Sequence, residues 1–140
     1  MKFSPCGWFC FDEPAGWVCA DTPESILLSH PPSGAVIEVT SARRDQRVRQ
    51  SEMWALLEKS MLNMPGAEFE ETSMYRLPGN AECLRSVQSN SGILQGLAFA
   101  FWSRYCIQVK LQADTEAFRI DDCIRGLSEL LESIQVLTTD

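Results

Sequence analysis

Histidine is nearly absent from this chain of 140 residues: His30 is the single histidine, and it stands before Pro31 and Pro32. Because histidine is the most frequent general base, a cysteine–histidine nucleophile would have to recruit this one residue. The sequence also has no Gly-x-Ser-x-Gly elbow and no phosphate-binding glycine loop. We therefore expect a protein that is not an enzyme, with no catalytic residue, metal or cofactor.

Long apolar runs are also missing. The longest, from Gly92 to Trp102, contains Gln95 and falls well short of the roughly 20 residues that span a bilayer. Near the amino end, Asp12, Glu13 and Pro14 interrupt the chain before the apolar core of a signal peptide can form. We expect no stable membrane insertion and a cytoplasmic protein.

Positive charge is scarce, with 12 Lys and Arg against 19 Asp and Glu and a formal net charge of -7. An acidic surface repels phosphate backbones, so we expect no nucleic-acid partner. The one basic segment contains Arg43, Arg44, Arg47 and Arg49. It is either a site for an anion or acidic partner or, as is more common, a solvated connector whose exposed ion pairs contribute about 0–1 kcal/mol.

Cysteine is more frequent, and its spacing is informative. Three of the six cysteines are crowded near the amino end and three are scattered: Cys6, Cys10, Cys19, Cys83, Cys106 and Cys123. The spacing lacks the close pairs of structural zinc sites, and the chain is long and apolar for a disulfide scaffold. We interpret the cysteines as mainly buried free thiols that pack like small hydrophobic residues.

The order of the predicted elements indicates one α+β domain over residues 1–140. Early strand-like segments include Val36 to Ala42, and a helix begins near Ser51, which is a suitable N-cap. A meander of strands follows from Glu68 to Gln112, and a closing helix covers Asp122 to Ile134. We predict an antiparallel β-sheet packed with two main α-helices.

The strongest hairpin is formed by the segments on either side of Ser103 and Arg104. If these two residues form the turn, Trp102 faces Tyr105, and large side chains oppose small ones along one face of the hairpin. A helix can pack closely on such a face, so we assign it to the core. A slip of one residue would exchange the two faces.

The opposite face of this hairpin is half aromatic and half polar. It carries Leu97, Phe99, Phe101, Cys106, Gln108 and Lys110. In one interpretation, a helix or the aromatic amino-terminal segment covers this face. In the other, it is an open apolar patch that binds an apolar segment of a partner protein, and all of these residues except Cys106 contact the partner.

Several local features carry a resemblance to a known superfamily. Gly16-Trp17 follows an acidic turn, the strand from Val36 to Ala42 leads into the first helix, and Pro65-Gly66 closes that helix before the meander. In this layout the chain resembles, over nearly its whole length, the PsbP-like superfamily of the photosystem extrinsic protein, Mog-type Ran-binding proteins and Eag-type effector chaperones. The resemblance implies an α/β/α sandwich and a binding protein without catalysis, and in the chaperone branch the sheet holds apolar segments of secreted toxins.

These observations predict a non-enzymatic protein-binding module. In its more specific form it is a chaperone or adaptor for a secreted effector, and it binds a protein or apolar peptide segment on an apolar sheet face. One alternative is a small thiol-based enzyme or redox protein centred on the three cysteines near the amino end. Another is an immunity-type inhibitor, whose acidic residues would bind a basic toxin.

Overall fold

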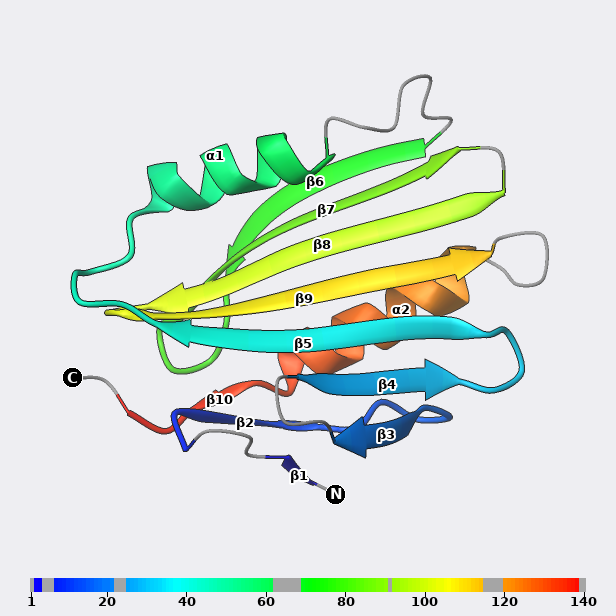
Figure 1. The fold of residues 1–140 in the computed structure, drawn as a ribbon, viewed down its shortest axis with the longest axis horizontal. Coiled ribbons are helices and arrows are strands. Elements are labelled where there is room, and N and C mark those ends of the chain that lie inside the picture. The colour runs from blue at the N-terminus through cyan, green and yellow to red at the C-terminus, as the bar shows by residue number, and fades with distance from the viewer. Residues whose placement is uncertain are drawn as a thin grey trace.

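A seven-stranded antiparallel sheet forms the centre of the structure. The structure is a computed structural model, and it describes residues 2–3, 7–21, 25–61, 69–90, 92–114 and 120–138. The strand order is β3-β4-β5-β9-β8-β7-β6 (Figure 1). The strands are β3 (Val18–Asp21), β4 (Ile26–His30), β5 (Ala35–Arg43), β6 (Phe69–Arg76), β7 (Glu82–Asn90), β8 (Ile93–Trp102) and β9 (Tyr105–Asp114).

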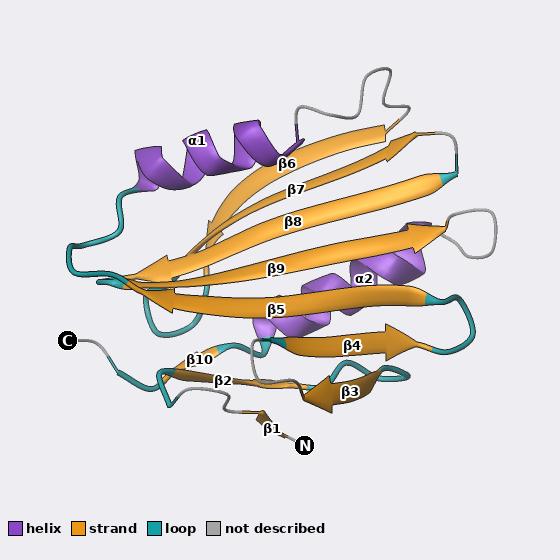
Figure 2. Ribbon diagram, viewed as in Figure 1, coloured by secondary structure: helices purple, strands orange, loops and turns teal. Residues whose placement is uncertain are grey.

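The two helices lie on opposite faces of this sheet. Helix α1 (Gln50–Met61) packs on β7 and β8 from one side, and α2 (Ile120–Glu132) packs from the other (Figure 2). A small second sheet joins β2 (Phe9–Asp12) to β1 (Lys2–Phe3) and β10 (Gln135–Val136). The predicted α+β fold, an antiparallel sheet with two main helices, is confirmed.

The predicted hairpin register is confirmed by the pairing of β8 with β9. Trp102 lies opposite Tyr105, and Ala98 lies opposite Val109. The turn contains neither glycine nor asparagine, yet Ser103 has a φ of 49°, the positive value that tight hairpin turns need at their first central residue. A positive φ is unfavourable for a residue other than glycine, so the hydrogen-bonded pairing of β8 with β9 must offset the energetic cost at Ser103.

Small residues on the core face of the sheet let α2 approach closely. A Cβ added at Gly96 would lie 3.2 Å from Leu111 and 3.3 Å from Leu127 of α2, so even an alanine there would require these side chains to shift slightly. Likewise, a Cβ at Gly126 would lie 2.6 Å from Nε1 of Trp17. The early Gly16-Trp17 segment is thus fixed by the packing of its indole on α2.

The face opposite α2, called the outer face below, has its own core under α1. This second core comprises Val48, Met53, Leu57, Leu84, Leu97, Phe99, Phe101 and Cys106. The exposed fractions of Leu97, Phe99 and Phe101 are only 3%, 2% and 3%. The hypothesis that these three side chains form an open patch is therefore wrong, because α1 covers them.

Both helices begin earlier than the sequence predicts. Helix α1 begins at Gln50, and Glu52 reaches back to accept a hydrogen bond of 3.3 Å from the backbone N–H of Arg49, so Ser51 lies inside the first turn. Helix α2 begins at Ile120, before the predicted start at Asp122. The predicted helix end at Pro65-Gly66 lies outside the described residues.

The burial of Phe99 predicts a large effect on stability. Replacing Phe99 with Ala leaves a cavity between α1 and the sheet, and we expect the free energy of unfolding to fall by about 3–5 kcal/mol in urea titrations. Trp54→Ala on α1 is the control, because Trp54 is 37% exposed and its replacement should lower the free energy of unfolding far less. Equal stability of Phe99→Ala and the wild type would contradict the covered core.

Candidate functional site

Helix α1 covers only part of the outer face. It contacts β7 and β8, whereas the outer-face side chains of β4, β5 and β9, apart from the buried Cys106, remain exposed or half-buried. We call this region the open half. It includes Leu27, Val36, Glu38, Thr40, Gln108, Lys110 and Gln112. A partner can reach the sheet here without displacing a helix.

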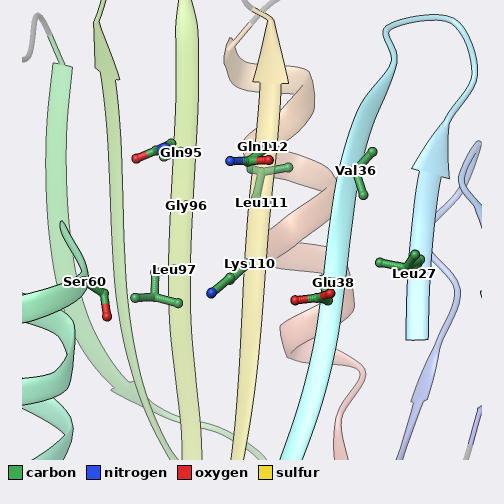
Figure 3. A pocket seen from close by; sticks show the side chains of 10 residues that line it. All are labelled: Leu27, Val36, Glu38, Ser60, Gln95, Gly96, Leu97, Lys110, Leu111 and Gln112. Carbon is green, nitrogen blue, oxygen red and sulfur yellow. The ribbon is translucent and has the colours of Figure 1, made fainter. Parts of the chain in front are cut away.

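A pocket of about 410 Å³ lies where the open half meets the carboxyl end of α1 (Figure 3). We call it the sheet pocket. It is lined by Leu27, Val36, Glu38, Ser60, Gln95, Gly96, Leu97, Lys110, Leu111 and Gln112. Ser60 near the end of α1 forms one wall, and the strands form the floor.

The strand register explains the chemistry of the sheet pocket. Seven of its side chains belong to two rows of directly opposed residues: Leu97, Lys110, Glu38 and Leu27 in one row, and Gln95, Gln112 and Val36 in the other. In the first row, two charged side chains stand between two apolar ones. In the second row, the two amide side chains of Gln95 and Gln112 lie next to each other and Val36 follows them. The pocket therefore offers apolar contacts at its edges and hydrogen-bonding groups in its middle.

The polar groups of the sheet pocket are not fully paired with one another. Glu38 and Lys110 are opposed in register, yet the ion pairs found among the described residues do not join them. Figure 3 shows Lys110 extending toward β8 and Glu38 toward β9. Beside the pocket, Gln88 faces Gln95, is 9% exposed, and has a buried Oε1 atom without a hydrogen-bond partner. Such groups favour a ligand that supplies hydrogen bonds.

The structure separates the residues that the sequence predicted as partner contacts. Lys110 and Leu97 line the sheet pocket, and Gln108 lies half-buried on the same face without lining it. Phe99 and Phe101 lie under α1. Sequence reasoning missed the contributions of β4 and β5, because they reach the site only through the long-range pairing of β5 with β9 and the pairing of β4 with β5. The alternation of exposed and buried residues in β5 was their one local signal.

His30 is a half-buried residue at the end of β4, and its side chain packs against other parts of the fold. Its Nδ1 atom lies 2.9 Å from Oγ of Ser33, and the centre of its ring lies 5.3 Å from that of Trp17. Gly16 lies beside the same imidazole, since a Cβ built there would lie 3.6 Å from Nε2. Among the described residues, no group of three or more His, Cys, Asp or Glu side chains is placed to hold a metal ion.

Most cysteines of the described chain are buried. Cys10, Cys83, Cys106 and Cys123 are buried and Cys19 is half-buried, as predicted, whereas Cys6 lies outside the described residues. Burial raises the pKa of Cys106 from its ordinary value of 9.0 to about 11, and it also raises the pKa values of Cys83 and Cys123. Since the thiolate is the nucleophile, these three thiols are poorly suited to redox chemistry.

A polar cluster links β6 and β7 to α2 on the core face of the sheet. One nitrogen of the Arg85 guanidinium lies 2.7 Å from Oγ of Ser128 on α2, and another lies 2.7 Å from a carboxylate oxygen of Glu71. The guanidinium carbon is 5.9 Å from the centre of the Tyr75 ring, whose pKa is raised chiefly by burial. The Arg85 contacts fix β6 and β7 against the helix, so we assign this cluster to stability.

Comparisons with known proteins show the fold alone. No protein-family model matches the sequence, and no curated protein is similar to it. The solution structure of the cyanobacterial PsbP protein from Synechocystis sp. PCC 6803 is similar, with a TM-score of 0.65 and 11% identity over 97% of this chain and 91% of that one. A crystal structure of a protein from Bacteroides thetaiotaomicron has a TM-score of 0.64 and 14% identity over 98% of this chain.

The chain spans 48% of the Bacteroides protein, and thus about half its length. The α+β fold matches that of cyanobacterial PsbP, so the PsbP-like architecture predicted from the sequence is supported. Within the described part of the chain, neither helix is long and apolar enough to cross a membrane.

The raised thiol pKa values predict slow alkylation of the native protein. Because burial raises the pKa of Cys106 to about 11, this thiol has about a hundredfold less thiolate at mildly alkaline pH than an exposed cysteine. We expect iodoacetamide to modify Cys106, Cys83 and Cys123 slowly in the native protein and rapidly after denaturation, as followed by peptide mass spectrometry. Rapid modification of native Cys106 would contradict its burial.

Proposed function

We propose that this protein is a non-enzymatic protein-binding module that holds an extended peptide segment of a partner in the sheet pocket. The observation that carries the proposal is the position of that pocket on the open half, with apolar edges and a polar middle. Partner-binding pockets commonly combine apolar walls with a few polar groups that fix orientation.

An extended segment suits this lining because it presents side chains and backbone groups in alternation. Leu27 and Val36 provide apolar surface for its side chains, and the nearly buried Leu97 closes the pocket on the other side. Gln95 and Gln112 each have an amide that donates and accepts hydrogen bonds, as a peptide backbone requires. A charged ligand of one sign would gain less, because Glu38 and Lys110 oppose each other in the pocket.

The more specific role is a chaperone or adaptor for a secreted effector, acting in the cytoplasm. The resemblance to Eag-type chaperones, which hold apolar segments on their sheet, supports this form of the proposal. In this protein the open half would hold such a segment, since the aromatic residues under α1 already belong to the core. The thiol-based alternative gains no support from the buried cysteines, whose pKa values are raised.

Selection from a random peptide display library, followed by titration of the selected peptides, tests the proposal. Val36→Asp places a charge in the sheet pocket, and we expect it to weaken binding at least about tenfold, which corresponds to about 1.4 kcal/mol. Val18→Asp is the matched control: Val18 also lies on the outer face and is 55% exposed, against 39% for Val36, but it does not line the pocket.

The expected result includes amide shift changes confined to β4, β5, β8 and β9 in NMR spectra recorded with the peptide. Melting temperatures close to that of the wild type would show that both variants fold. If Val36→Asp and Val18→Asp reduced affinity equally, or if neither did, the sheet pocket would not be the binding site.

A further inference from the structure

The fold gathers arginines at one end of the sheet, where β5 and β8 end and β9 begins (Figure 1). Half of the 12 lysines and arginines of the chain lie there: Arg43, Arg44, Arg47, Arg49, Arg76 and Arg104. They come from the end of β5, the connection to α1, the end of β6 and the turn between β8 and β9. We call this surface the arginine end. In the sequence, only Arg43, Arg44, Arg47 and Arg49 lie close together, whereas Arg76 and Arg104 are distant from them.

Backbone hydrogen bonds hold these segments together. The backbone N–H of Arg44 donates to the carbonyl oxygen of Arg104 at 2.8 Å, and that of Val48 donates to the carbonyl oxygen of Ser103 at 2.7 Å. The connection between β5 and α1 is thus fixed on the hairpin turn. Its arginines are therefore held in place as a surface and do not belong to a loose connector.

The arginine end is positive in an acidic protein. Among the described residues of these segments and of the elements paired with them, three carboxylates accompany the six arginines: Asp45, Glu52 and Glu82. Glu52 forms an ion pair with Arg44, and Glu82 lies opposite Arg76 in register. Three positive charges remain in excess, whereas the whole chain has a formal net charge of -7. This end therefore attracts a partner with negative charge.

A second pocket, of about 700 Å³, opens at the arginine end, and we call it the arginine pocket. Three exposed arginines line it: Arg47, Arg49 and Arg76. Three buried apolar side chains also line it: Val48, Phe101 and Trp102. Guanidinium groups therefore surround an apolar floor, so the pocket can contact an apolar side chain and pair with carboxylates at the same time.

We infer that the arginine end binds an acidic peptide segment of a partner protein, one that contains apolar residues among its Asp and Glu. A small anion fits less well, because the arginines are exposed and spread over four segments. The described polar atoms that are buried without a partner belong to Ser73, Arg85 and Gln88, none of which lines this pocket. A long nucleic acid would extend beyond the arginine end onto a surface that repels phosphate.

This inference is independent of the proposed sheet pocket. Gln50, at the amino end of α1, lines the arginine pocket, and Ser60, near its carboxyl end, lines the sheet pocket. Helix α1 has 12 residues, so the two pockets are separated by about 15 Å along its axis. Each site can therefore be tested with the other intact.

Fluorescence anisotropy with a labelled peptide of alternating Glu and Leu tests the inference. We expect binding at low ionic strength that weakens as salt is added, and a loss of about tenfold in Arg47→Ala/Arg76→Ala. Arg125→Ala/Lys59→Ala is the matched control, because it removes the same charge from residues that do not line the arginine pocket. Val36→Asp should leave this binding unchanged, which separates the result from that for the sheet pocket.

Other outcomes would overturn the inference. An equal loss in the two double variants would mean that net charge alone attracts the peptide. Tighter binding of labelled oligothymidine than of the peptide would identify a nucleic-acid surface. Complete competition by inorganic phosphate at matched ionic strength would indicate a small-anion site. Self-association that Arg47→Ala/Arg76→Ala abolishes would assign the arginine end to a second copy of the chain.

Discussion

The packing of α1 on β7 and β8 determines which parts of the molecule are available for binding. Met53 and Leu57 of the helix cover the aromatic part of the outer face, and Phe99 and Phe101 become core residues beneath them. Burial of a Phe side chain contributes about 1.5–3 kcal/mol, so the two rings together favour the docked helix strongly. Because α1 ends at Met61, the rest of the face stays open.

Both proposed sites follow from this arrangement. The sheet pocket forms where the helix stops, and the arginine pocket forms where the helix begins. Each combines an apolar surface with polar or charged groups, but their chemistry differs: opposed charges and amides in the first, guanidinium groups in the second. A partner could use one site for an extended segment and the other for an acidic one. The similarity to cyanobacterial PsbP concerns the fold, and these two surfaces rest on the side chains of this chain.

Local patterns were enough to predict the fold class, the hairpin register and the two helices, because alternation and helical spacing report on neighbouring residues. They could not decide whether α1 covers Phe99 and Phe101, since an apolar face looks the same in sequence whether a helix or a partner covers it. They also could not place Val36 and Glu38 beside Lys110, because that contact depends on the pairing of β5 with the distant β9. Arg76 and Arg104 were missed as companions of the basic run for the same reason.

Native-state hydrogen exchange of the α1 amides tests the central claim most directly. If the helix is a fixed part of the core, its amides should exchange only through openings whose free energy approaches that of the β8 and β9 amides. Fast exchange throughout α1, with β8 and β9 still protected, would contradict the account. It would mean that the helix opens readily and uncovers Phe99 and Phe101.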